Sequence, residues 1–143
     1  MKSLEMALDY INRAYRTFKE AKNAYKDKDY PLTIRRAQEA VELSLKAVLR
    51  LIGIEYPREH DVKDVFIEAI ASRDLPEWFK AEAELMGNIS SDLARKRGLA
   101  FYGDEHALKP PSSLFSKKDA LEALKAAEKV YKNCRKLIKS TLA

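Results

Sequence analysis

The segment from about Pro31 to Ile52 constrains the fold most, because as a helix it would be apolar around most of its circumference. Two adjacent stripes run along it at helical spacing, one with Ile34, Ala37, Val41, Leu45, Val48 and Ile52, the other with Ala40, Leu43, Ala47 and Leu51. Such a helix must be covered on several sides. We therefore expect it at the centre of a bundle, with Gly53 as its left-handed cap.

Four more helices are predicted by apolar residues that recur three or four positions apart. They cover about Ser3 to Asp27, Val62 to Ser72, Asp74 to Arg97 and Ser116 to near the C-terminus. Asp74 is the expected cap of the fourth helix and Gly98 its stop, while Ser116 and Asp119 form a capping-box pair for the last. No stretch of useful length is typical of a strand. The prediction is an all-α protein, an antiparallel up-and-down bundle of four long helices and one short helix, in a single domain over residues 1–143.

Residues 98–115 show no helical or strand period. An irregular connection of this length is unusual in a compact domain, and such segments are commonly functional or mobile. We expect a loop here.

The positive charge is concentrated at the C-terminal end. The chain has 27 Lys and Arg against 22 Asp and Glu, a net charge of +5. From Lys117 onward there are eight basic and three acidic residues, so the preceding 116 residues are neutral. This excess indicates either a nucleic-acid footprint or a solvated helix face with cations near the helix C-terminus.

Several chemistries are disfavoured. There is no glycine-rich phosphate loop, GxSxG, CxxC or HExxH motif. Glu59-His60-Asp61 with Asp64 resembles a metal-binding pair, but further histidines are missing, so Asp61 is expected to cap the next helix and no metal or cofactor is predicted. The single cysteine, Cys134, allows no internal disulfide, which favours a reducing cytoplasm. No stretch is apolar enough for a membrane span.

The densest group of candidate functional residues is Arg95, Lys96 and Arg97, followed by Phe101, Tyr102 and His106. Guanidinium forks fit phosphate oxygens, aromatic faces stack on bases, and a histidine can exchange protons near neutral pH. The alternative is structural: the cations complement a helix end, the aromatics plug the bundle, and His106 is solvated. The residues alone leave both interpretations open.

The stretch RRAQEAVELSLKAVLRLIGIEYPREHDVKDV, residues 35–65, resembles the HEPN domain (higher eukaryotes and prokaryotes nucleotide-binding). The resemblance lies in a small-residue-rich helix ending in Lys46-Ala47-Val48-Leu49, then Gly53, Pro57 and His60 before a short helix. An ARxRGxAxYGDE-like stretch at 94–105, a tyrosine-rich first helix and a basic last helix extend it over nearly the whole chain. It implies an all-α bundle, usually a homodimer, often with a positive cleft at the interface.

The resemblance also implies what to expect of catalysis. Many HEPN proteins are metal-independent ribonucleases or toxins, with an arginine followed after four to six residues by a histidine. Here Tyr102 occupies that position relative to Arg95 and Arg97, and His106 lies further on. A phenol with a pKa of about 10 is a poor proton shuttle at neutral pH, so catalysis is disfavoured.

We expect a homodimer in which Arg95, Lys96, Arg97 and Tyr102 bind nucleotide or RNA phosphate. The heptad-like seams of the first and last helices agree with a dimer. The resemblance adds a minimal nucleotidyltransferase as a partner in a toxin–antitoxin-like pair. One alternative is a HEPN endoribonuclease that uses His106 or Tyr102 for proton transfer. Another is a module that only binds a partner protein.

Overall fold

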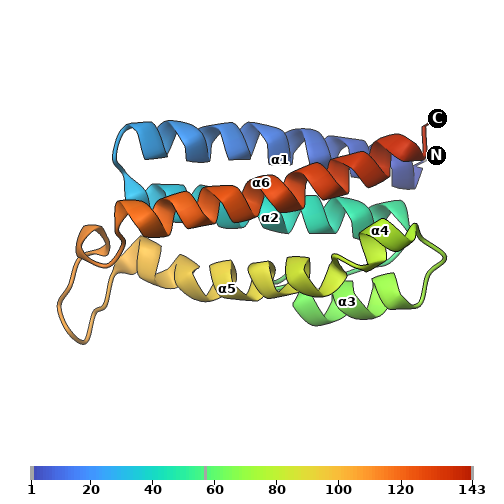
Figure 1. Ribbon diagram of the computed structural model, residues 1–143. Coiled ribbons are helices and arrows are strands. Elements are labelled where there is room, and N and C mark those ends of the chain that lie inside the picture. The colour runs from blue at the N-terminus through green and yellow to red at the C-terminus, as the bar shows by residue number, and fades with distance from the viewer. Residues whose placement is uncertain (1, 57, 143) are drawn as a thin grey trace.

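The computed structural model describes residues 2–56 and 58–142, and within them it contains helices and no β-strand. The helices are α1 (Lys2–Lys26), α2 (Tyr30–Leu51), α3 (Lys63–Ala71), α4 (Glu77–Lys80), α5 (Ala83–Tyr102) and α6 (Lys117–Ser140), with a 3-10 helix, η1 (Pro111–Ser113). Figure 1 shows the four long helices running side by side, with α3 and α4 at one end. The predicted all-α bundle is confirmed.

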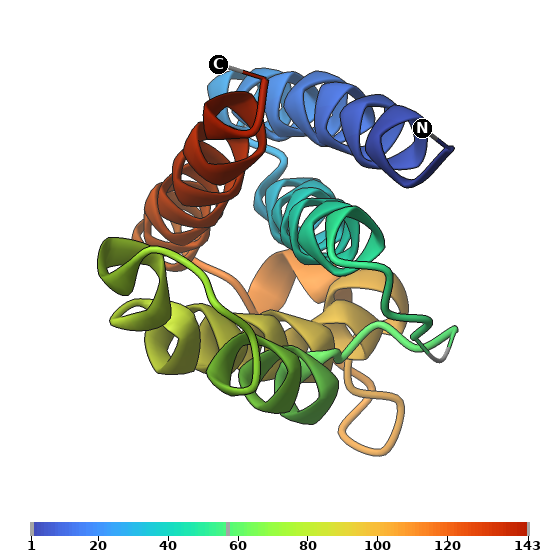
Figure 2. The ribbon, with the colours of Figure 1, turned by 90° about the vertical axis from the view of Figure 1, so that its right-hand side faces the viewer.

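Helix α2 lies at the centre of the bundle. It packs against α1, α5 and α6, and Figure 2 shows α1 above it and α5 below it. Both apolar stripes contribute to the core, and the side chains that are at most 1% exposed include Ile34, Ala37, Ala40, Val41, Leu45, Ala47, Val48 and Leu49. Each fully buried Val, Leu or Ile contributes about 1.5–3 kcal/mol, so this helix organises the core.

The predicted helix caps at Gly53 and Ser116 are confirmed. Gly53 has φ +75°, its N–H donates to Arg50 O at 3.1 Å, and the N–H of Ile54 donates to Leu49 O at 2.9 Å. At the start of α6, Ser116 Oγ accepts from the Asp119 N–H at 3.1 Å, and Asp119 Oδ2 accepts from the Ser116 N–H at 2.8 Å. That backbone hydrogen bond lowers the pKa of Asp119.

The prediction of one helix from Asp74 to Arg97 is wrong at both ends. Asp74 is exposed and caps nothing: Pro76 precedes the single turn α4, and the chain turns before α5 begins at Ala83. The turn allows Phe79 to be buried, with its ring edge-on to Phe66 of α3 at 6.1 Å. Tertiary packing therefore overrides the local cap signal.

Gly98 does not end α5, which continues to Tyr102. Ala100, at 3% exposure, belongs to the core, and burying it requires another helical turn. The C-terminal cap is Gly103, with φ +76° and an N–H that donates to Leu99 O at 2.9 Å.

The expected loop at 98–115 is therefore more ordered than predicted. After α5, Asp104 and Lys109 form an antiparallel bridge with two N–H···O bonds of 2.9 Å, and η1 follows. This segment projects from the end of the bundle (Figure 1). None of the helices in the described residues is both long enough and apolar enough to cross a membrane.

Candidate functional site

A buried glutamine connects the central helix to α5. The side chain of Gln38 in α2 is 1% exposed, its Oε1 accepts from Arg97 Nη1 at 2.8 Å, and its Nε2 donates to Glu42 Oε1 at 2.9 Å. Buried amides need such partners, because an unpaired one costs roughly 1–3 kcal/mol. The guanidinium of Arg97 is thus held in one orientation by the core of the bundle.

Glu42 connects this amide to two further charged or titratable groups. Lys46 Nζ lies 2.7 Å from Glu42 Oε2, and His60 Nδ1 lies 2.7 Å from Glu42 Oε1. Burial raises the pKa of Glu42, but hydrogen bonds from Lys46, Gln38 and His60 together lower it below its ordinary value. The carboxylate therefore holds the side chain of His60 beside α2.

A second carboxylate, Glu39, lies between two arginines. Its Oε1 is 2.6 Å from Arg36 Nη1 and 3.6 Å from Arg97 Nη1, and Arg36 Nε also reaches Glu20 of α1 at 3.0 Å. The side chain of Arg97 is 25% exposed. A guanidinium has five N–H donors, so Arg97 keeps donors for a ligand in addition to those that face Gln38 and Glu39.

One turn further along the same helix pair, an arginine stacks on an aromatic ring. The Arg35 guanidinium carbon lies 4.3 Å from the ring centroid of Phe101, and Arg35 Nε is buried with no hydrogen-bond partner in the described residues. Phe101 and Tyr102 are 50% and 66% exposed, with ring centroids 4.6 Å apart. We call Arg35, Gln38, Glu39, Arg97, Phe101 and Tyr102 the α2–α5 site.

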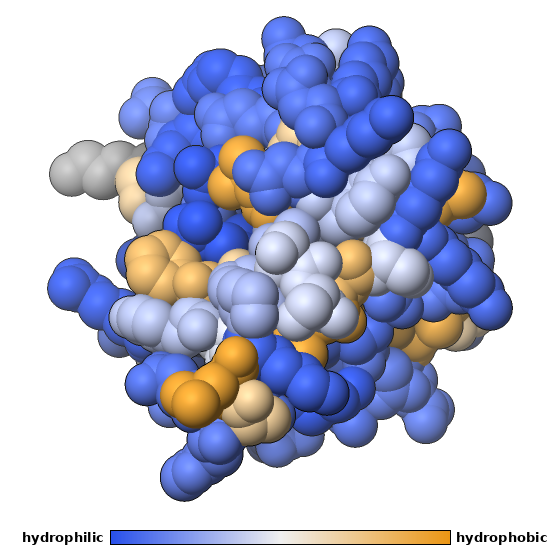
Figure 3. Space-filling view, turned by 90° about the vertical axis from the view of Figure 1, so that its left-hand side faces the viewer, coloured by the Kyte–Doolittle hydropathy of each residue, from blue (hydrophilic) through white to orange (hydrophobic). Residues whose placement is uncertain are grey.

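The end of the bundle that carries these aromatics has scattered apolar groups on a polar surface (Figure 3). The exposed large apolar side chains at the C-terminal end of α5 and in the following segment are Leu99, Phe101, Tyr102 and Leu108, and Leu108 is 87% exposed with φ +55°.

Not all of the predicted site residues come together. Arg95 Nη2 lies 2.5 Å from Asp92 Oδ1, and Lys96 Nζ lies 2.9 Å from Asp92 Oδ2. Two positions along a helix correspond to a rotation of about 200°, so Arg95 points away from Arg97. Within one subunit Arg95 and Lys96 therefore pair with Asp92 and do not lie beside Arg97, while the convergence of these cations between two subunits stays a prediction.

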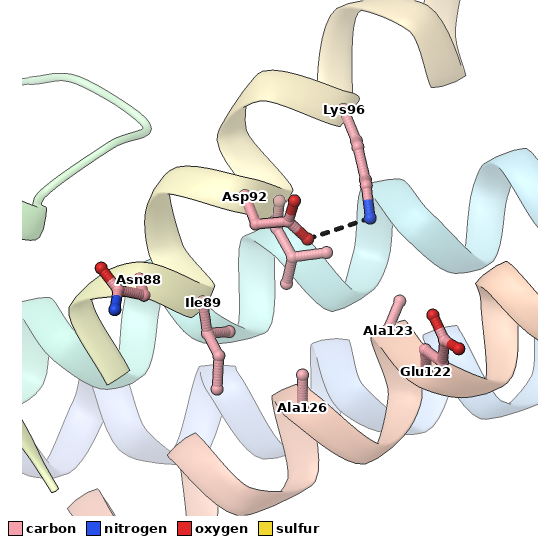
Figure 4. A pocket seen from close by; sticks show the side chains of 8 residues that line it. Asn88, Ile89, Asp92, Lys96, Glu122, Ala123 and Ala126 are labelled. Atoms are coloured by element: carbon pink, nitrogen blue, oxygen red, sulfur yellow. Dashed lines mark ion pairs between the residues drawn. The ribbon is translucent and has the colours of Figure 1, made fainter. Parts of the chain in front are cut away.

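Asp92 and Lys96 instead line a hollow between α5 and α6, with a volume of about 270 Å³ (Figure 4). Its apolar lining comes from Ile89, Leu93, Ala123 and Ala126, and Asn88 and Glu122 add polar groups. The ion pair of Lys96 with Asp92 lies at its edge, which gives this hollow no excess of positive charge.

The two histidines lie in different places. His106 is exposed in the segment between Gly103 and η1, while His60 is held by Glu42 in the network that includes Arg97. Asp61 accepts from the Lys63 N–H at 3.0 Å, at the first residue of α3, and from Ser91 Oγ at 2.7 Å. Among residues 2–56 and 58–142, no three His, Cys, Asp or Glu side chains are grouped to hold a metal ion.

Gln38, Glu42 and His60 of this network, and Arg35 and Glu39 of the α2–α5 site, were not among the predicted site residues. A usable signal was present: in a helix that is otherwise largely buried, Arg35, Gln38, Glu42 and Lys46 form a polar line at helical spacing. Polar side chains at such positions require partners from another element.

Comparisons with known proteins agree over nearly the full chain. A family model described as the HEPN domain matches residues 7–137. A Methanocaldococcus jannaschii protein named "Putative toxin MJ1304" is 31% identical over 140 residues, covering 96% of this chain and 91% of that protein. A crystal structure of ST0689, described as an archaeal HEPN homologue, has a TM-score of 0.67 at 21% identity and covers 92% of this chain and 97% of that one.

Proposed function

The chain belongs to the HEPN domain family, and on this premise we propose that it binds RNA or nucleotide phosphate at the α2–α5 site. The observation that carries the proposal is the hydrogen bond from Arg97 Nη1 to the buried Gln38 Oε1 at 2.8 Å. It orients a partly exposed guanidinium before any ligand arrives, so little conformational entropy is lost on binding.

The neighbouring side chains suit the same ligand. Arg35 places a second guanidinium beside Phe101, and the exposed rings of Phe101 and Tyr102 offer faces on which a base can stack. Glu39 limits the affinity of the site for phosphate. Its carboxylate lies 3.6 Å from Arg97 Nη1, so a phosphate would compete with it for the guanidinium. We therefore expect affinity to depend on how many phosphates the ligand offers and to fall with added salt.

The biological setting is also part of the proposal. Because a relative with 31% identity is named as a toxin, we propose that this chain is the toxin-like half of a toxin–antitoxin-like pair. Family resemblance adds a homodimer and a minimal nucleotidyltransferase as the partner protein. In a homodimer, Arg95, Lys96 and Tyr102 of two subunits would surround a shared cleft.

The binding test is a titration of fluorescein-labelled 12-nucleotide RNA, with unlabelled nucleotides as competitors, followed by fluorescence anisotropy. Losing a charge-assisted hydrogen bond costs about 1.5–3 kcal/mol, so Arg97→Ala should weaken binding roughly 10- to 100-fold. Arg73→Ala is the matched control, because Arg73 is exposed and lies outside the α2–α5 site. The RNA affinity of Arg95→Ala tests whether Arg95 contributes to the cleft shared by two subunits. Absence of saturable binding, or an Arg97→Ala variant that binds like wild type, would contradict the proposal.

A metal-independent endoribonuclease is the second candidate, and one observation favours it. The pair of His60 and Glu42, 2.7 Å apart, belongs to the network that orients Arg97. A carboxylate orients an imidazole for proton transfer, and a guanidinium stabilises the charge that develops on the phosphorane, worth about 3–4 kcal/mol per donor.

Incubation of structured RNA with the protein and a chelator tests this candidate. Cleavage by wild type that is lost in Arg97→Ala would support it, and separate variants His60→Ala and His106→Ala would show which histidine carries protons. Intact RNA after incubation with wild type would remove it and leave the binding proposal standing.

A further inference from the structure

A hollow follows the seam where α1 packs on α6. Its volume is about 480 Å³, and its lining residues are Ile11, Asn12, Tyr15, Tyr131, Lys132, Arg135 and Lys139. The two tyrosine rings lie 5.7 Å apart, and Tyr15 is 46% exposed. Two aromatic rings therefore belong to the lining of this hollow, and its α6 side is cationic.

A second hollow on α1 continues this surface. It is lined by Lys19, Lys22, Asn23 and Lys26. Aromatic contacts join the two hollows: Lys19 Nζ lies 5.0 Å from the Tyr15 ring centroid, and Lys22 Nζ lies 5.7 Å from that of Phe18. Phe18 in turn stacks on Tyr131 at 6.5 Å. We call the combined surface the α1–α6 groove.

The charge of the α1–α6 groove is one-sided. Six cations and no carboxylate are among the described residues that line the two hollows. Lys132 has an ion-pair partner in the described part of the chain, Glu128 at 3.5 Å, whereas Lys19, Lys22, Lys26, Arg135 and Lys139 have none there. These cations are thus available to an anion.

The α1–α6 groove is distinct from the α2–α5 site. Glu20 of α1 points to α2, where it pairs with Arg36 at 3.0 Å, and Lys22, about 200° further around the helix, lies on the other side of α1. In Figure 2, α1 and α5 lie on different sides of α2. The two surfaces are therefore built from different helix pairs.

We propose that the α1–α6 groove binds a single strand of RNA, whose phosphates contact the lysines and Arg135 while bases stack on the tyrosine rings. The combination favours RNA over other polyanions: an acidic peptide or an anionic membrane would use the cations, but neither has planar bases for Tyr15 and Tyr131. Stacking on aromatic side chains requires unpaired bases, which selects a single strand. This inference rests on the proposed function only for its ligand class, RNA. The location of the groove is argued from the contacts described above.

The test measures binding of a fluorescein-labelled 24-nucleotide oligouridine, and of uridine monophosphate, to the full chain. The groove variant is Lys132→Gln, Arg135→Gln and Lys139→Gln combined. Its matched control combines Lys63→Gln, Arg73→Gln and Lys80→Gln, which removes the same charges near α3 and α4. We expect the groove variant to bind the 24-mer at least tenfold more weakly than the control variant. Three phosphate contacts should also reduce the slope of log K against log salt by about 2.

A charge-preserving variant tests the stacking. Tyr15→Leu replaces a 46% exposed side chain, so the fold should persist, and the melting temperature checks this. Because each stacked base contributes to affinity, we expect at least fivefold weaker 24-mer binding while binding of heparin, a polyanion without bases, stays unchanged. Equal 24-mer binding by wild type and Tyr15→Leu, or by the groove and control variants, would overturn the inference.

The two proposals fail separately. If the 24-mer responds to Arg97→Ala but not to the groove variant, the inference fails and the proposed function stands. If uridine monophosphate does not bind and the 24-mer responds to the groove variant alone, the proposed function fails and the inference stands. No RNA binding at all overturns both.

Discussion

Arg97 Nη1 lies 2.8 Å from Oε1 of Gln38, so a partly exposed cation of α5 is oriented by an amide of α2 that is 1% exposed. The same amide donates to Glu42 at 2.9 Å. Both ends of Gln38 are therefore occupied, and the position of Arg97 depends on how α2 packs in the core. A change in the core should alter the site even though no ligand-contacting residue is replaced.

Replacing Gln38 by Leu keeps a similar volume and removes both hydrogen bonds. Because Arg97 and Glu42 would each lose a partner, we expect the free energy of unfolding to fall by about 1–3 kcal/mol and RNA affinity to fall with it. Urea unfolding measures the first and anisotropy the second. Ser44→Ala is the control: the Ser44 hydroxyl donates to Ala40 O of its own helix, so RNA affinity should be kept. Wild-type stability and affinity in Gln38→Leu would refute this reasoning.

Acid should destabilise the protein partly through Glu42. Its pKa in the folded protein lies below the ordinary value of 4.5, because hydrogen bonds from Lys46, Gln38 and His60 outweigh the effect of burial. The ionised carboxylate therefore stabilises the fold above pH 4.5, and this contribution is lost as the pH falls through the lowered pKa. We expect Glu42→Gln to be less stable than wild type at pH 7, with the difference shrinking at pH 3. Urea titrations at the two pH values measure it, and a difference that does not change with pH would argue against this role.

Two glycines of one segment should respond oppositely to alanine. At Gly103, where φ is +76°, a Cβ would overlap the carbonyl oxygen of Lys109, so Gly103→Ala should destabilise the cap and the 104–109 bridge. Gly98 is helical, and a Cβ there would meet no atom within 4 Å, so Gly98→Ala should stabilise α5 by about 0.5–1 kcal/mol. Thermal unfolding of both variants checks the pair, and a Gly103→Ala variant as stable as Gly98→Ala would contradict it.

Leu99 and Leu108, two exposed apolar side chains near the α2–α5 site, should be covered by a second copy. They are 42% and 87% exposed, and packing against a second copy would remove this apolar surface from water. We expect sedimentation equilibrium to give a mass near twice 16.4 kDa. A mass of one chain at all concentrations would remove the shared cleft from the proposal, while binding at the α2–α5 site of a single subunit would remain.

Local signals in the sequence predicted the elements whose physics is local. Gly53 and Ser116 act on backbone groups within a few residues of themselves, so their caps were predicted correctly. The signal of Asp74 was equally local but failed, because burial of Phe79 required a turn between α4 and α5. Gly98 failed as a stop for a similar reason: one more turn buries Ala100.

The candidate site shows where local information ends. Arg95 and Arg97 are alike in sequence, yet one pairs with Asp92 at the surface while the other reaches a buried amide 59 positions away. Apolar periodicity by itself determined that this protein is a helical bundle with α2 at its centre, because burial requires each apolar stripe to be covered. Only the tertiary structure decided which cation Gln38 orients and which histidine Glu42 holds, because those contacts depend on how the helices pack against each other.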